Sequence, residues 1–182
     1  MAKLIIGLAG EIGSGKGTAA KYVAEKYGAS SYRFSTMLRD VMDRLYIEQN
    51  RKNISELSTL LRKRFGEDLL AKVMAEDVKK DENKVIVIEG IRRSADIAYL
   101  KEIPEFKFVF IEAKLERRYK RIIQRGENTD DKEKTFEEFK KEHELETEAQ
   151  IKDFKQHADF VLKNDGALED LYKQIDDIIS KN

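Results

Sequence analysis

The sequence GEIGSGKGT at residues 10–18 decides the fold of this chain. An apolar run at residues 4–9 precedes it, and an amphipathic run at residues 19–27 follows it. A strand, a glycine-rich loop and a helix in this order form the context of a phosphate-binding loop, or P-loop. Glycines lack a Cβ, so the loop can curl and bring its N–H groups and the helix N-terminus close to phosphate oxygens. We therefore predict that nucleotide phosphates bind at Gly10, Gly13, Ser14, Gly15, Lys16, Gly17 and Thr18.

Lys16 carries the one full positive charge of this loop, on a flexible stem that suits a β- or γ-phosphate. The Ser or Thr that usually follows this lysine is Gly17 here, and the hydroxyl comes one residue later, at Thr18. We expect Thr18 to lie towards a bound magnesium ion.

Composition narrows the class of protein. The 182 residues suit one domain, and 35 basic residues balance 35 acidic ones, which argues against a general binder of nucleic acid or anionic membranes. No cysteine is present, so disulfides and cysteine-bound metals are excluded. The apolar runs are too short to span a membrane, and the first strand begins too early for a signal peptide. We expect a cytoplasmic protein; its oligomeric state is not indicated.

Strands alternate with helices along the chain. Apolar runs at residues 3–9, 85–88, 106–111 and 160–162 predict strands, and residues 31–34 predict a further short one, with amphipathic helices between them. This order predicts an α/β three-layer sandwich around a five-stranded parallel sheet. The long helical interval at residues 35–80 indicates a lobe beside the sheet. Residues 126–134 contain no apolar side chain and predict a mobile loop, and Thr135 and Glu138 form a capping box that opens another helix.

A carboxylate and two arginines follow the clearest strand. Glu89 ends this strand, and Arg92 and Arg93 come directly after it. Open α/β sheets bind ligands at the carboxyl ends of their strands, so Glu89 is a candidate for the metal and the arginines for a phosphate. The alternatives are a surface glutamate at a strand end and an arginine in a structural ion pair.

Two further groups of basic residues are candidate anion ligands. Arg118, Arg121 and Arg125 share one helical face that leads into residues 126–134, as in a lid that closes over a triphosphate. The alternative is a solvated basic face. Ser35 and Arg39 lie where a helix begins, so an anion would find a guanidinium beside free N–H groups. The alternative for Arg39 is an exposed helical arginine.

These segments resemble two families of kinases. GLAGEIGSGKGT at 7–18 resembles the P-loop of dephospho-CoA kinases at its start and of adenylate kinases at its end. FSTMLR at 34–39 is similar to the segment of adenylate kinases that holds the acceptor phosphate, without its usual Gly-Asp. VIVIEGIRRSADIAYL at 85–100 resembles their Asp-Gly-Phe-Pro-Arg stretch, with Glu89, Arg92 and Arg93 in the places of Asp, Pro and Arg. RIIQR at 121–125 resembles their lid-hinge motif. ADFVLKNDGALEDLYKQID at 158–176 resembles the carboxyl end of dephospho-CoA kinases and of archaeal adenylate-kinase-related proteins.

The resemblance covers nearly the whole chain. It implies one P-loop nucleoside-monophosphate-kinase domain over residues 1–182, with an acceptor lobe at about 35–80 and a lid at about 126–150. It implies an ATP- and Mg²⁺-dependent kinase of small molecules. We expect a nucleoside or deoxynucleoside monophosphate as the acceptor, because the two arginines Arg39 and Arg93 suit an acceptor phosphate. The alternatives are a dephospho-CoA kinase and a nucleotide-binding regulatory or assembly ATPase.

The same resemblance distributes the roles of the site residues. Lys16, the loop amides and Arg121 would hold ATP, and Thr18 and Glu89 would face the metal. Arg121 and Arg125 would close over the transferring group. Four residues would hold the acceptor: Ser35, Arg39, Arg92 and Arg93.

Overall fold

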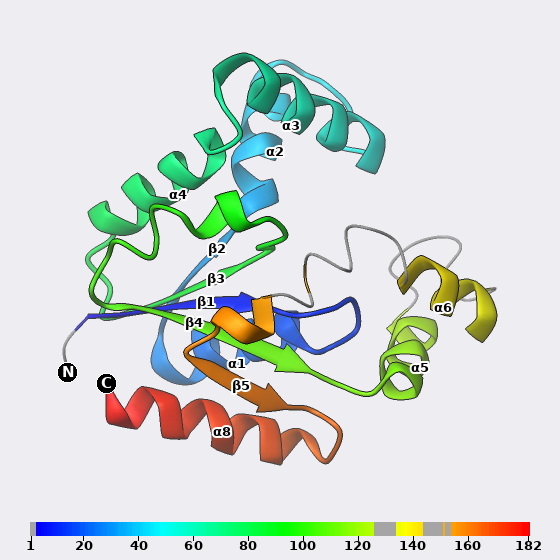
Figure 1. Ribbon diagram of the computed structural model, residues 1–182. Helices are drawn as coiled ribbons and strands as arrows, with labels where there is room; N and C mark the ends of the chain where they lie inside the picture. The colour runs from blue at the N-terminus through cyan, green and yellow to red at the C-terminus, as the bar shows by residue number, and fades with distance from the viewer. Residues whose placement is uncertain (1–2, 126–133, 144–150, 152–153) are drawn as a thin grey trace.

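A parallel β-sheet forms the centre of the computed structural model, which describes residues 3–125, 134–143, 151 and 154–182 (Figure 1). Within this part of the chain the sheet has five strands in the order β2-β3-β1-β4-β5. Their bounds are Leu4–Ala9 (β1), Ser30–Arg33 (β2), Val85–Glu89 (β3), Phe106–Glu112 (β4) and Phe160–Lys163 (β5). The predicted five-stranded parallel sheet is confirmed.

Helices cover both faces of this sheet. One face carries α1 (Lys16–Tyr27) and α8 (Leu168–Lys181), and the other carries α4 (Leu69–Lys80) and the short 3₁₀ helices η1 (Ser94–Ile97) and η2 (Phe154–His157). Figure 1 shows α2 (Phe34–Arg44) and α3 (Arg51–Phe65) above the sheet, and α5 (Leu115–Arg125) and α6 (Phe136–His143) beyond the strand ends. The α/β sandwich places the carboxyl ends of the strands at the edge where the P-loop lies.

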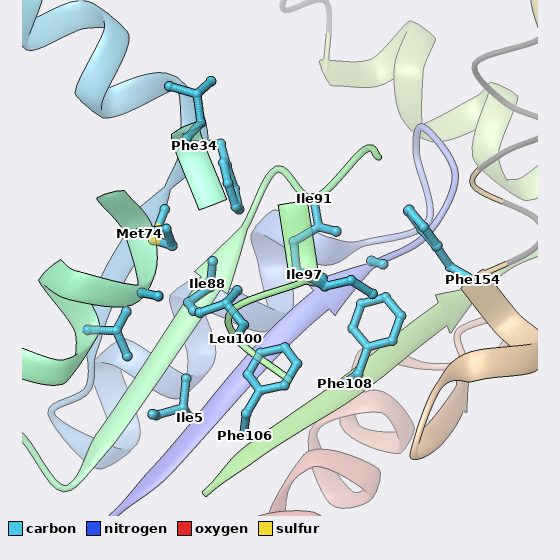
Figure 2. Close-up of a cluster of buried hydrophobic side chains, with 14 of the residues drawn as sticks. Ile5, Phe34, Met74, Ile88, Ile91, Ile97, Leu100, Phe106, Phe108 and Phe154 are labelled. Atoms are coloured by element: carbon cyan, nitrogen blue, oxygen red, sulfur yellow. The ribbon is translucent and has the colours of Figure 1, made fainter. Parts of the chain in front are cut away.

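Successive strand residues alternate between two hydrophobic cores. In β1, Leu4 and Ile6 pack towards α1 and α8, while Ile5 packs towards α4 and η1. Figure 2 shows the core on the α4 side of the sheet, where Ile5 lies beside Phe106 and the other labelled side chains surround them. Because both faces are buried at the centre of the sheet, β1, β3 and β4 read as nearly continuous apolar runs, which is why the sequence revealed them.

The interval between β2 and β3 consists of α2, α3 and α4. That these helices bind an acceptor stays a prediction. The capping box before α6 is confirmed, since the Thr135 N–H donates to the Glu138 carboxylate and the Glu138 N–H donates to the Thr135 hydroxyl. Most of the predicted lid, residues 126–133 and 144–150, lies outside the described residues. Among the helices that the structure describes, none combines the length and apolarity needed to cross a membrane.

Candidate active site

The P-loop connects β1 to α1 and packs tightly on the elements beneath it. Gly13 has φ 76°, and a Cβ there would lie 2.8 Å from the carbonyl oxygen of Arg118. Gly15 has φ 107°, and a Cβ there would lie 2.3 Å from the Asn164 side-chain nitrogen. Both positions need glycine because the φ is left-handed and the space is filled. The loop is therefore preformed as a cradle of backbone groups, which fits a phosphate ligand.

Gly17 offers a sharp contrast and a test. A Cβ at Gly17 would meet one neighbour at 3.7 Å, an ordinary contact, and this residue lies in the first turn of α1. We expect Gly17→Ala to keep or raise stability by about 0.5–1 kcal/mol, since alanine favours the helix. Gly15→Ala should instead lower stability by several kcal/mol and reduce nucleotide affinity, because Asn164 and the left-handed φ oppose it. Thermal unfolding and nucleotide titration of the two variants would measure this; equal effects would contradict the preformed loop.

Asn164 holds the loop from below, a role that the sequence did not reveal. This residue follows β5 and is 4% exposed. Its side-chain amide donates to the Ser14 carbonyl over 2.8 Å, and its backbone carbonyl accepts from Arg121 over 2.7 Å. Its position directly after the last strand, at the carboxyl edge of the sheet, is the feature of the sequence that could have indicated this role.

Arg118 also supports the loop, which corrects its predicted place on a lid. Its side chain is 2% exposed, and its guanidinium lies 3.3 Å from the Glu11 carboxylate. It also donates to the carbonyls of Ile12 and Ala113, over 3.2 and 3.1 Å. The prediction treated the arginine face of α5 as exposed, whereas Arg118 at the start of that face is buried against the P-loop and only Arg125 at its end is exposed. Arg118 is a buried structural cation.

Arg121 lies between the loop and the residue that supports it. Besides its bond to Asn164, its guanidinium donates to the Gly13 carbonyl over 3.4 Å. Burial lowers the pKa of Arg121, partly offset by the nearby charge of Asp165. A half-buried guanidinium of this kind would gain from an anionic ligand. Arg125 is the last residue of α5, next to residues outside the described part of the chain.

Lys16 folds back over its own loop. Its ammonium donates to the Gly10 carbonyl over 2.6 Å and to the Glu11 carbonyl over 3.0 Å. The charge is therefore held against the first two residues of its own loop.

Glu89 reaches across to the start of α1. Its Oε2 is the atom 3.7 Å from a Cβ at Gly17, one residue before Thr18. Its Oε1 accepts from Arg33 Nε over 2.7 Å, and Arg33 Nη2 contacts the same oxygen. The sequence did not single out Arg33, because the two residues become neighbours only through the pairing of β2 with β3, which sets them side by side.

Arg92 and Arg93 lie on a loop that a buried carboxylate shapes. The backbone N–H groups of both residues donate to Asp96 Oδ2, each over 3.0 Å. Asp96 pairs in turn with Arg62 of α3 over 2.7 Å, and these side chains are 3% and 5% exposed. The arginine side chains stay exposed at the edge of the sheet, and Arg93 pairs with Glu67 over 2.9 Å. The structure thus brings both arginines to the edge that bears Glu89.

Arg39 differs from its predicted place. The helix begins at Phe34, before Ser35, so Arg39 lies in the second turn of α2 and not the first. Its guanidinium donates to the Gln49 side-chain oxygen over 2.9 Å. The free N–H groups of the helix start therefore lie one turn away from this charge, because Arg33 and not Ser35 or Thr36 precedes the helix.

A cavity of about 300 Å³ opens beside the P-loop, at the carboxyl end of β4. Its apolar wall includes Phe110 and Leu115, and Glu11 and Arg118 supply part of its charge. A second ion pair at its lining joins Glu112 to Lys155 over 2.6 Å. The cavity therefore offers both signs of charge next to the loop that would hold donor phosphates.

A glycine cradle with its lysine, at the carboxyl edge of a five-stranded parallel sheet, defines a protein of the P-loop kinase fold. Two solved structures of other proteins share this fold. Shikimate kinase from Bacteroides thetaiotaomicron superimposes with a TM-score of 0.65 at 16% identity, covering 98% of this chain and 97% of that one. TT1252 from Thermus thermophilus gives 0.65 at 17% identity, covering 100% and 98%.

A family model described as an AAA domain matches residues 9–140, so the chain belongs to this family. Two sequence relatives match this chain over nearly their whole length. The UPF0200 protein of Hyperthermus butylicus is 27% identical over 98% of this chain and 95% of its own. The UPF0200 protein of Methanoregula boonei is 28% identical over 96% and 95%.

Proposed function

We propose that this protein is an ATP-dependent nucleotide kinase that transfers the γ-phosphoryl group to a nucleoside or deoxynucleoside monophosphate. The observation that carries the proposal is the convergence at one sheet edge of a preformed P-loop, Glu89 and the Arg92–Arg93 pair. Phosphoryl transfer needs positioned charge more than a covalent catalyst, and this edge concentrates such charge.

On the donor side, the residues present fit a nucleotide with its magnesium ion. The cradle amides and Lys16 would bind the phosphates, and Arg121 would lie over the loop next to Asn164. Glu89 Oε2 faces the first turn of α1, where Thr18 supplies a hydroxyl, and these oxygens suit Mg²⁺. The ion would neutralise phosphate charge during transfer.

On the acceptor side, Arg93 supports the choice of a monophosphate. Its guanidinium already holds a carboxylate, that of Glu67, so an anionic group fits its fork. A phosphate dianion would bind there, and the positive charge of Arg93 would screen the repulsion between this dianion and the γ-phosphate. Arg92, Arg39 and Ser35 complete the proposed acceptor set. In this protein Arg39 would have to leave Gln49 to reach a ligand.

A second candidate is a kinase that phosphorylates a hydroxyl, as in dephospho-CoA. It is favoured by Glu11, whose carboxylate lines the cavity beside the P-loop. A carboxylate there would accept the hydroxyl proton as the new oxygen–phosphorus bond forms and the bond to ADP breaks. The Arg118 pair would keep that carboxylate in place.

The deciding experiment is a phosphate-transfer screen of ATP against the eight common ribo- and deoxyribonucleoside monophosphates and dephospho-CoA. In wild-type protein we expect transfer to at least one monophosphate. Arg93→Ala should raise the transition-state free energy for that acceptor by about 2–4 kcal/mol, seen as a lower kcat/KM, while ATP affinity stays nearly unchanged, because the proposed role of this arginine is confined to the acceptor.

Arg64→Ala is the matched control, since it removes an exposed arginine of α3 that has no proposed role, and it should leave both constants unchanged. Transfer to dephospho-CoA with none to any monophosphate would overturn the first proposal and establish the second. ATP binding without transfer to any acceptor would point instead to a regulatory ATPase.

A further inference from the structure

The carboxylate of Glu89 lies between the side chain of Arg33 and the start of α1. The two side chains come from directly paired residues of neighbouring strands. Arg33 takes one carboxylate oxygen, with Nε at 2.7 Å, while the other oxygen faces the position of Gly17. One oxygen of the Glu89 carboxylate therefore binds an arginine, and the other faces the proposed nucleotide site.

The two partners of this pair differ in how firmly they are held. The Glu89 side chain is 13% exposed, whereas that of Arg33 is 51% exposed. The carboxylate of Glu89 is thus mostly enclosed by the fold, whereas the side chain of Arg33 is half-exposed to water. Half-exposed ion pairs contribute little to stability, so another cation would displace this guanidinium at small cost.

The Arg33 side chain also lies next to the start of the loop that carries Arg92 and Arg93. Its Cγ is 3.5 Å from the position of a Cβ at Gly90, at the start of the loop that carries Arg92 and Arg93. A guanidinium released from Glu89 would remain at this edge, and its planar fork suits phosphate oxygens.

We propose that Arg33 is the resident counter-ion of Glu89, that the divalent cation accompanying the donor nucleotide competes with it there, and that the released guanidinium binds the acceptor phosphate. This inference rests on the proposed kinase function. It makes Arg33 a link between the two substrates, since binding of the metal nucleotide frees a cation for the acceptor.

Removal of Arg33 then has two effects of opposite sign. Glu89 loses a competitor, so the metal ion should act at lower concentration. The acceptor loses a charged contact, so it should bind less well. A purely structural role would weaken both interactions, because a disordered Glu89 and a loosened loop would serve neither substrate.

The test is a Mg²⁺ titration of wild-type protein and of Arg33→Met, with a fluorescent ADP analogue as the probe. For Arg33→Met we expect half-maximal enhancement of binding at about threefold lower Mg²⁺ or less. We also expect a KM about tenfold higher for the best substrate among AMP, CMP, GMP and UMP. Arg33→Lys keeps the charge and should show the wild-type Mg²⁺ dependence.

The matched control is Arg44→Met, which removes an exposed arginine from the end of α2 and should change neither quantity. An unchanged Mg²⁺ dependence in Arg33→Met, or weaker binding of both metal and acceptor, would overturn the inference while the proposed function stands. Absence of nucleotide binding by wild-type protein at every Mg²⁺ concentration would overturn both.

Discussion

Replacement of Lys16 with alanine is expected to lower kcat/KM for phosphoryl transfer by about 10²- to 10⁴-fold, equivalent to about 3–5 kcal/mol of transition-state stabilisation. Lys16 is the one side chain with full positive charge within the cradle of residues 10–18. Its ammonium is held within the loop by the carbonyls of Gly10 and Glu11. Charge that develops on the transferring group would meet this cation without reorganisation of the loop, which is the reason for the large effect.

The fold should survive this change. Lys16 lies at the start of α1 and contributes no side chain to either hydrophobic core. The matched control is Lys21→Ala, which removes an exposed lysine from the next turn of the same helix and should leave kcat/KM unchanged. Steady-state kinetics with thermal unfolding would separate catalysis from folding. Wild-type turnover in Lys16→Ala would show that the loop does not act on a donor phosphate.

Replacement of Arg118 with methionine is expected to destabilise the protein by about 3–5 kcal/mol, because it leaves the carboxylate of Glu11 largely buried without its cation. The side chains of Arg118 and Glu11 are 2% and 12% exposed. The variant also loses the bonds that tie Ile12 and Ala113 to this guanidinium. For a chain of this length the midpoint of thermal unfolding should fall by about 6–20 °C.

Arg117→Met provides the control, since it removes the neighbouring arginine of α5, which is exposed. It should shift the midpoint by no more than a few degrees. Glu11→Gln in the Arg118→Met background should recover part of the loss, because it removes the largely buried charge that Arg118 balances in the wild-type protein. Equal midpoints for Arg118→Met and Arg117→Met would show that the buried pair does not support the loop.

The sequence alone determined the parts of this protein that depend on local pattern. The three central strands β1, β3 and β4 were recognisable because both faces of the sheet are buried there, so their residues are mostly apolar. The edge strands β2 and β5 are only partly buried and are less apolar. The P-loop was recognisable because a tight backbone cradle requires glycines at fixed spacing, and this spacing can be read directly from the sequence. Lys16 and Glu89 followed from their positions relative to these elements.

The contacts between elements distant in sequence were decided only by the tertiary structure. Arg33 meets Glu89 across 56 residues, and Asn164 supports Ser14 across 150 residues. The helical period placed Arg118 correctly on one face of α5, but it could not tell whether that face meets water or the P-loop. The physical reason is that burial and pairing depend on how helices and strands pack, whereas periodicity reports only which residues share a face.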